Sequence, residues 1–190
     1  MSDLLRLMKN RRTHRKFLAK EVPFDWVREA LQAFRWAPSG ANRQPWKLVL
    51  VADPSQKARI RHLVETGEKE FHPRAPNWMR RFFAEQGITP EKDFLSDAPY
   101  LLCVFGLKKA PYFKESVWLA VGWFLLALEE KGLATVTYTP SRKRAVSELL
   151  GISSEWDLQV ILPIGFAAED ERIADRPRKE LSEILKISKE

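Results

Sequence analysis

The sequence has very little cysteine, since Cys103 is the single one among 190 residues. One thiol excludes a disulfide within the chain, and it cannot supply a thiolate cluster for a metal. Cys103 lies in the apolar run YLLCVFGL, where we expect a buried packing residue. The three histidines, His14, His62 and His72, do not have the spacing of metal ligands, and His62 and His72 are expected on the surface. The sequence therefore predicts no metal site.

Glycine is also scarce, with eight scattered residues and no pair at the G-x-G spacing. This excludes the dinucleotide-binding fingerprint and the P-loop, and there is no G-x-S-x-G nucleophile elbow. Any nucleotide must therefore be held in another way.

Long uncharged apolar runs are missing as well. No stretch reaches the roughly 18 residues that a membrane helix needs, and the N-terminus has no signal pattern. We therefore expect a cytoplasmic protein without a membrane partner.

The composition that remains is that of one globular domain over residues 1–190, with 45% hydrophobic and 30% charged residues. Seven Trp and eleven Phe are many for this length, and some are expected at a ligand site or subunit interface. The net charge of +7 favours an anionic partner such as a phosphorylated cofactor, a nucleic acid or a membrane surface. The basic residues are spread along the chain, often beside acidic ones, which argues against nucleic acid.

Hydrophobic periodicity predicts alternating helices and strands, and therefore an α+β or α/β class. Asp25 and Ser141 are expected as N-caps, while Gly67 and Gly132 are expected at helix C-termini. The segment 114–132 is apolar nearly all round, which is typical of a helix buried inside a domain or a dimer. Helices are predicted at 2–10, 24–36, 54–67, 77–86, 114–132, 141–151 and within 179–187, and strands at 46–52, 99–107, 133–138 and 156–166.

Three polar clusters are candidates for a binding site. In RRTHRKF (11–17), an extended backbone points Arg11, Thr13 and Arg15 to one side, as an anion clamp requires. APSGANRQPW (37–46) presents backbone groups and short polar side chains before an apolar strand, and DRPRKEL (175–181) again alternates two arginines. Taken singly, the first is explained more simply as a basic surface strand and the third as a charged tail. The second fits an ordinary turn equally well.

In this order, with EEKGLATVTY, LLGI and LQVILPIGF between them, the clusters resemble the FMN-dependent nitroreductase family over nearly the whole chain. The resemblance implies an α+β fold with a central mixed, mainly antiparallel sheet flanked by helices. It also implies a homodimer with FMN at the subunit interface.

By the same resemblance, the basic motif holds the ribityl phosphate and the pyrimidine side of FMN, and the 38–42 loop contacts the flavin of the partner subunit. The late arginines approach the phosphate, and Gln44 is a further candidate without an assigned role. No catalytic side chain is assigned. The implied FMN contacts are Arg11, Thr13, Arg15, Pro38, Ser39, Gly40, Asn42, Gln44, Arg176 and Arg178.

Two segments depart from the family pattern. The turn that meets the flavin N5 region in many members is ATVTYTPS (134–141) here, so a backbone contact from Thr137, Tyr138 or Thr139 stays open. The aromatic-rich region 68–97 is expected to determine the substrate. Four of its residues either line the acceptor pocket or pack in the core or an interface: Phe71, Trp78, Phe82 and Phe83.

The resemblance implies an oxidoreductase that passes electrons from NAD(P)H through FMN to a nitroaromatic or quinone-like acceptor. Cationic groups near flavin N1 and O2, with Arg11 or Arg15 as candidates, would stabilise the reduced ring. Three alternatives stay open: a specialised relative of the flavin-cleaving or reductive dehalogenase type, a family fold with a degenerate flavin site, and a non-enzymatic basic module that binds nucleic acid.

Overall fold

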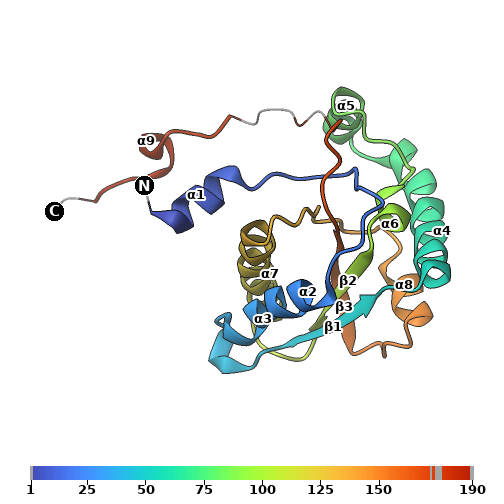
Figure 1. Cartoon of the computed structure of the whole chain (residues 1–190), viewed down its shortest axis with the longest axis horizontal. Helices are drawn as coiled ribbons and strands as arrows, with labels where there is room; N and C mark the ends of the chain where they lie inside the picture. The colour runs from blue at the N-terminus through green and yellow to red at the C-terminus, as the bar shows by residue number, and fades with distance from the viewer. Residues whose placement is uncertain (1, 172, 174–176, 189–190) are drawn as a thin grey trace.

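A three-stranded antiparallel sheet forms the centre of the computed structural model, which describes residues 2–171, 173 and 177–188 (Figure 1). The strand order is β1 (Trp46–Val51), β2 (Tyr100–Leu107) and β3 (Trp156–Ile164). Cys103 in the central strand lies opposite Val49 on one side and Ile161 on the other. The three strands match the predicted apolar runs, and every pairing in this sheet is antiparallel.

Helices cover both faces of the sheet, which explains why the strands are apolar on both sides. Residues alternate along β2, so Leu102 and Val104 face one layer while Leu101 and Phe105 face the other. The first layer consists of α2 (Phe24–Ala30), α3 (Gln32–Trp36) and α7 (Phe113–Glu130). The second consists of α4 (Pro54–Phe71), α6 (Phe94–Asp97) and α8 (Lys143–Leu149).

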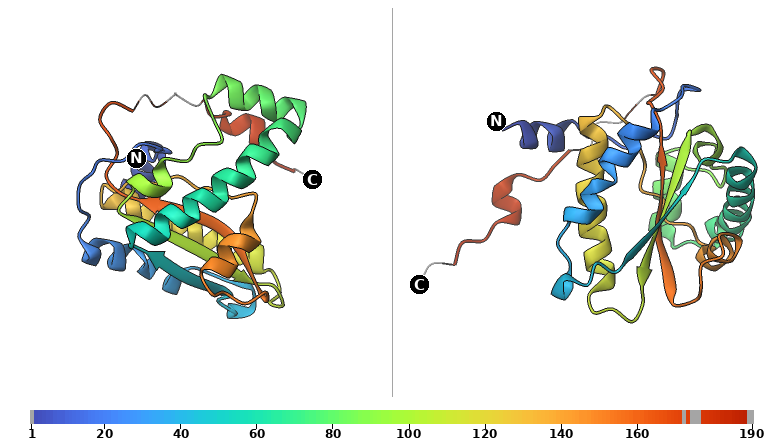
Figure 2. Two further views of the ribbon diagram at one scale, coloured as in Figure 1. Left: turned by 90° about the vertical axis from the view of Figure 1, so that its right-hand side faces the viewer. Right: turned by 60° about the horizontal axis from the view of Figure 1, so that its bottom comes forward.

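The two ends of the chain lie outside this layered body (Figure 1). Helix α1 (Asp3–Asn10) has no buried residue, and α9 (Leu181–Ile184) is one short turn with exposed apolar side chains. Helix α5 (Asn77–Glu85) projects beyond the end of α4, as the left view of Figure 2 shows. The 3₁₀ turns η1 (Gly40–Asn42) and η2 (His72–Arg74) complete the elements.

Several predicted boundaries were wrong. The helix expected at 24–36 is divided at Leu31, and Asp25 is not its N-cap because the helix already begins at Phe24. Asp25 instead pairs with Arg28 at 2.9 Å. Helix α4 does not end at Gly67 but continues to Phe71, since glycine is tolerated in a helix interior at modest cost.

The segment predicted as a strand at 133–138 forms no regular ladder. It meets β3 and its continuation through two isolated bridges, Ala134 with Gly165 and Tyr138 with Ile161. Ser141 is not an N-cap either, because α8 begins two residues later and the Ser141 side chain bonds elsewhere. Gly132, with φ of +67°, confirms the predicted end of α7.

Candidate flavin and substrate site

The basic motif 11–17 is an extended segment fixed to the body by its backbone. The His14 N–H donates to the Thr135 carbonyl at 3.0 Å, and the Leu18 N–H donates to Phe166 at 2.9 Å. The carboxylate of Glu171 accepts the Arg15 N–H at 2.7 Å and lies 3.0 Å from His14 Nδ1. The motif therefore runs beside the 134–141 segment, as a shared flavin site would require.

Arg11 is half-buried and lies near a second arginine. Burial lowers the pKa of Arg11, the neighbouring Arg178 lowers it further, and Glu129 acts in the opposite direction. A bound anion would reduce the repulsion between two neighbouring guanidinium groups, and guanidinium groups bind phosphate well. The structure thus places Arg178 beside the basic motif. The predicted Arg176 lies outside the described residues.

The loop 38–44 has an unusual backbone for residues other than glycine. Ala41, Asn42 and Gln44 have φ of 50°, 52° and 46°, in the left-handed region. Such backbone strain is found preferentially at functional sites. The Gln44 N–H donates to Ser39 Oγ at 2.9 Å, and the Gln44 side chain donates to Asn42 Oδ1 at 3.1 Å. The loop is therefore a defined structure held by its own side chains.

Contacts with the start of α7 fix the same loop to the body. The Gly40 N–H donates to Ser116 Oγ at 3.1 Å. A Cβ atom on Gly40 would lie 2.9 Å from Tyr112 Cδ2, so glycine permits this approach. Pro38 is exposed and directly follows Ala37, the C-cap of α3. A proline at this position prevents the helix from continuing.

The two predicted halves of the flavin site do not meet within one chain. The 38–44 loop contacts Ser116 near the start of α7, whereas Arg11 lies near Glu129 at its end. The 18 residues of α7 separate these ends by about 27 Å. The right view of Figure 2 shows the segment after α1 and the loop before β1 at opposite ends of α7.

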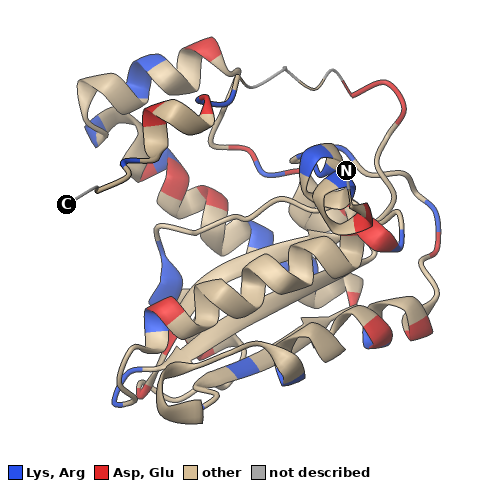
Figure 3. Ribbon diagram, turned by 90° about the vertical axis from the view of Figure 1, so that its left-hand side faces the viewer, with Lys and Arg blue, Asp and Glu red and all other residues tan. Residues whose placement is uncertain are grey.

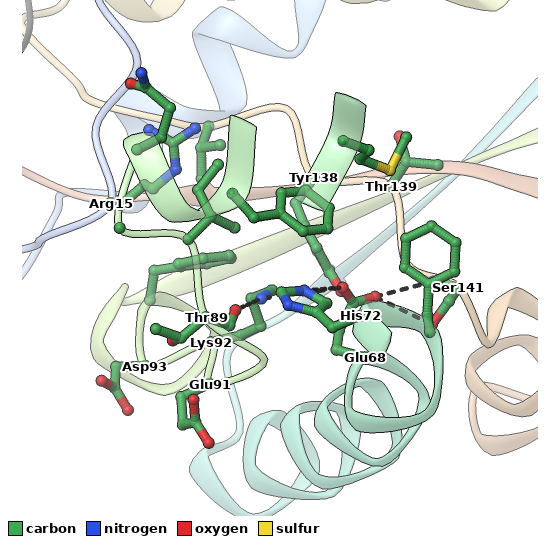
Figure 4. A pocket seen from close by; sticks show the side chains of 18 of the residues that line it. Arg15, Glu68, His72, Thr89, Glu91, Lys92, Asp93, Tyr138, Thr139 and Ser141 are labelled. Carbon is green, nitrogen blue, oxygen red and sulfur yellow. Dashed lines mark hydrogen bonds and ion pairs between the residues drawn. The ribbon is translucent and has the colours of Figure 1, made fainter. Parts of the chain in front are cut away.

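A cavity of about 540 Å³ lies beside the basic motif, between α4, α5 and the 134–141 segment (Figure 4). Of the four predicted aromatic residues, Phe71 and Phe83 line it. Trp78 and Phe82 do not line it, and both are exposed on α5. The remaining lining residues are Arg15, Glu68, His72, Met79, Gln86, Gly87, Ile88, Thr89, Glu91, Lys92, Asp93, Phe94, Val136, Thr137, Tyr138, Thr139 and Ser141.

Glu68 brings a buried carboxylate into this cavity, with 8% of its side chain exposed. Its Oε1 accepts the Ser141 N–H at 3.3 Å and the Ser141 hydroxyl at 3.0 Å. Its Oε2 lies 3.4 Å from His72 Nε2 and 4.0 Å from Lys92 Nζ. One oxygen is thus held by Ser141, while the other faces basic groups across the cavity.

Lys92 supplies the opposite charge and is 5% exposed. Burial lowers its pKa, and Glu68 is the first of the carboxylates that act against this. Its ammonium donates to the Thr89 carbonyl, and its backbone N–H donates to Glu65 at 2.8 Å. Glu65 also accepts from Arg61 at 2.7 Å, so the loop that carries Lys92 is tied to α4.

Tyr138 and His72 complete the polar lining. The Tyr138 hydroxyl is buried beside Glu68, and burial, followed by the charge of Glu68 and a hydrogen bond with it, raises the pKa of Tyr138. The His72 ring stacks on Phe83, with centroids 4.4 Å apart. Its side chain is 14% exposed, so the expectation of a plain surface histidine was wrong. Tyr138 and His72 thus both place a polar group next to the Glu68 carboxylate in the cavity.

Sequence reasoning missed Glu68, His72 and Lys92 as site residues. The one available signal was the i,i+4 spacing of Glu68 and His72, which places them about one turn apart where α4 ends and η2 begins. That spacing is common on helix surfaces and does not by itself indicate a site. Within the described residues, no group of His, Cys, Asp or Glu is arranged to hold a metal ion, and no helix is long and apolar enough to cross a membrane.

The arrangement is a basic anion site next to a cavity with paired opposite charges, in the fold described above. The chain belongs to the nitroreductase family, whose family model matches residues 8–166. This confirms the resemblance and the predicted fold class.

Among its relatives, the chain is similar to iodotyrosine deiodinase from Thermotoga neapolitana, with 44% identity over 95% of this chain and 96% of that protein. It is 33% identical to iodotyrosine deiodinase 1 from Mus musculus over 96% of this chain and 68% of that protein. A crystal structure of oxidized iodotyrosine deiodinase bound to FMN and 3-iodo-L-tyrosine has 42% identity and a TM-score of 0.89, covering 94% of this chain and 97% of that one. A nitroreductase with bound FMN from Bacteroides fragilis shares the fold, at 19% identity and a TM-score of 0.78, with full coverage of both chains.

Proposed function

We propose that this protein is an FMN-dependent reductive dehalogenase that acts on a halogenated tyrosine. The observation that carries the proposal is the pair of buried opposite charges, Glu68 and Lys92, in one cavity beside the basic motif. The similarity to iodotyrosine deiodinases supports the same function. This corresponds to the dehalogenase alternative rather than to the nitroaromatic or quinone reductase that the family resemblance implied.

The residues present fit FMN. Arg11 and Arg178 form the cationic site that a phosphate group would relieve, and Arg15 of the same motif lines the cavity. Thr13 lies between Arg11 and Arg15 in this extended segment. Thr137 to Thr139 also line the cavity, so a flavin between these segments would face the substrate. When bound and reduced, FMN supplies the two electrons that, with a proton, replace a carbon–halogen bond by carbon–hydrogen and release halide and oxidised flavin.

The cavity matches the charges of a free amino acid. The Glu68 carboxylate would accept the substrate ammonium, and the Lys92 ammonium would donate to the substrate carboxylate. A zwitterion between them would satisfy both buried charges, which is favourable because an unpaired buried charge is costly. The phenol ring would then extend past Phe83 towards Arg15 and the flavin.

We also propose that the active unit is a homodimer. The middle of α7, from 116 to 128, contains no charged residue, and Figure 3 shows this uncharged helix on one side of the molecule. Trp118, Leu119 and Trp123 on it are 41%, 51% and 47% exposed. A partner covering this apolar surface would place its 38–44 loop at the end of α7 near which Arg11 lies. Each flavin would then contact both subunits.

The second candidate function is reduction of a nitroaromatic or quinone with NAD(P)H as the electron donor. The family match and the aromatic lining of the cavity by Phe71 and Phe83 favour it. It does not account for the paired charges of Glu68 and Lys92, because these acceptors carry no zwitterion. A cytoplasmic location and the absence of a nucleic-acid partner stay predictions.

Product analysis tests the proposed function. The FMN-loaded protein is reduced with dithionite without oxygen, mixed with 3-iodotyrosine, and assayed for tyrosine and iodide. We expect both products in equal amounts, with kcat/KM reduced at least tenfold in Lys92→Met because a charge-assisted bond is lost. Lys69→Met, on the exposed surface of α4, is the matched control and should act like the wild type. Reduced protein that converts a nitroaromatic but releases no iodide would favour the second candidate.

A further inference from the structure

Glu68 has to keep one oxygen available to a ligand, although basic groups of the protein lie close to it. Its Oε2 is 4.0 Å from the Lys92 ammonium and 3.4 Å from His72 Nε2. A small rotation of the carboxylate would form a closed ion pair with Lys92 inside the empty cavity. Such a pair would occupy the Glu68 oxygen that a ligand ammonium needs, whereas the Lys92 ammonium has three N–H donors and would keep one for a carboxylate. The orientation of Glu68 therefore determines how well the cavity binds an ammonium group.

Ser141 opposes this rotation. Its hydroxyl and its backbone N–H both donate to Oε1, at 3.0 and 3.3 Å, on the side away from Lys92 (Figure 4). Two donors on the same oxygen define the orientation of a carboxylate better than one, and hydrogen bonds to a charged acceptor are the stronger kind. The second oxygen is left facing the cavity.

The position of Ser141 is itself fixed against α4. A Cβ atom on Gly67 would lie 2.6 Å from Ser141 Oγ, so the absence of a side chain at Gly67 permits this close approach. On the neighbouring residue, the Arg142 guanidinium pairs with Glu70 one turn further along the helix region. Three residues within one turn of α4 thus contact the 141–142 segment: Gly67, Glu68 and Glu70.

We propose that Ser141 is a positioning residue that sets the affinity of the cavity for the ammonium group of its ligand by holding the Glu68 carboxylate. The inference rests on the proposed function, because it takes the ligand to be a halogenated α-amino acid. Ser141 does not touch the substrate in this account and acts through Glu68. Without the hydroxyl, Glu68 keeps only the longer backbone contact and turns towards Lys92.

Calorimetric titration of the FMN-loaded full chain with two ligands tests this inference. One ligand is 3-iodotyrosine, and the other is 3-(4-hydroxy-3-iodophenyl)propanoate, which keeps the carboxylate but lacks the ammonium. In Ser141→Ala we expect the Kd of 3-iodotyrosine to rise about five- to tenfold, since one charge-assisted bond is lost while the N–H remains. The Kd of the propanoate should change by less than about twofold.

Three further variants separate positioning from general damage. Ser141→Thr keeps a hydroxyl and should restore the wild-type ratio of the two Kd values. Ser147→Ala removes a buried hydroxyl of α8 that donates to the Lys143 carbonyl at 3.0 Å and does not contact Glu68. This variant should leave the ratio of the two Kd values unchanged. In a Glu68→Gln background, Ser141→Ala should have no further effect on the ratio.

The outcomes distinguish this inference from the proposed function. A wild-type protein that binds neither ligand overturns the proposed function and the role of Ser141 together. A wild type that favours 3-iodotyrosine, combined with an unchanged ratio in Ser141→Ala, overturns the positioning role alone. Equal weakening of both ligands also overturns it, because that result shows a general structural effect.

Discussion

Replacing Gly67 by alanine changes the stability of the protein through two effects that act in opposite directions. Gly67 lies in the interior of α4, where alanine is better than glycine by about 1 kcal/mol in helix propensity. The new Cβ would lie 2.6 Å from both Ser141 Oγ and Arg142 Cγ, which is far inside van der Waals contact. Overpacking of this kind costs about 1–3 kcal/mol.

The cost does not end with the clash. Moving Ser141 away breaks its hydroxyl bond to the buried Glu68, and a hydrogen bond to a charged group contributes about 1.5–3 kcal/mol. The Arg142 side chain is long and can move aside more easily. We therefore expect Gly67→Ala to lower the free energy of unfolding by about 1.5–5 kcal/mol in net terms, despite the gain in helix propensity.

Urea unfolding at one fixed protein concentration measures this change, because the stability of the proposed dimer would depend on concentration. A double-mutant cycle identifies the cause: Ser141→Ala should cost at least about 0.5 kcal/mol less in the Gly67→Ala background than in the wild type. If Gly67→Ala instead stabilises the protein by about 1 kcal/mol, propensity alone decides the result and the close approach of Ser141 to α4 is refuted.

Three further predictions concern the cofactor, the charge of Lys92 and the buried thiol. Arg11→Ala should weaken FMN binding about 10- to 100-fold but leave riboflavin, which has no phosphate, nearly unaffected in fluorescence titrations; equal weakening of both would contradict a phosphate contact. Because burial lowers the pKa of Lys92 below 10.5, the affinity for 3-(4-hydroxy-3-iodophenyl)propanoate should fall as the pH rises through that lower value. Arginine stays protonated over this range, so the affinity of Lys92→Arg for the propanoate should not fall in the same way. If the affinity of both proteins falls equally with pH, Lys92 does not bind the carboxylate. Burial raises the pKa of Cys103 to about 12, so Ellman's reagent should react with it only in denaturant; rapid reaction of the folded protein would argue against the buried central strand.

The parts of the fold that sequence predicted well are those where burial imposes a simple pattern. The apolar runs that become β2 and α7 were predicted almost to their ends, because a strand or helix covered on most sides needs few polar residues. The end of α4 was missed because Gly67 is required for close packing against Ser141 rather than for helix termination. That requirement is tertiary and leaves no local signal.

The flavin-binding motifs and the cavity residues of the candidate site also differ in how far the sequence could predict them. Arg11, Thr13, Arg15 and the 38–44 loop were predicted because they lie in the short motifs that carry the family resemblance, and their flavin contacts stay predictions. Glu68 lies on α4, His72 begins the turn η2 that follows it, and Lys92 lies in a loop 24 positions after Glu68, so the charges of Glu68 and Lys92 meet only in the folded chain. Nothing in the sequence distinguishes a buried ion pair of this kind from solvated surface charges, so the cavity had to be seen in the structure.

The most direct test of the central claim is the anaerobic reoxidation of the dithionite-reduced, FMN-loaded protein, followed by flavin absorbance in a stopped-flow instrument. We predict that 3-iodotyrosine reoxidises the flavin with saturation, and that Glu68→Gln raises the half-saturating concentration at least tenfold. A quinone, which has no ammonium group, should reoxidise both proteins at the same rate. Reoxidation by the quinone with none by 3-iodotyrosine would contradict the dehalogenase assignment.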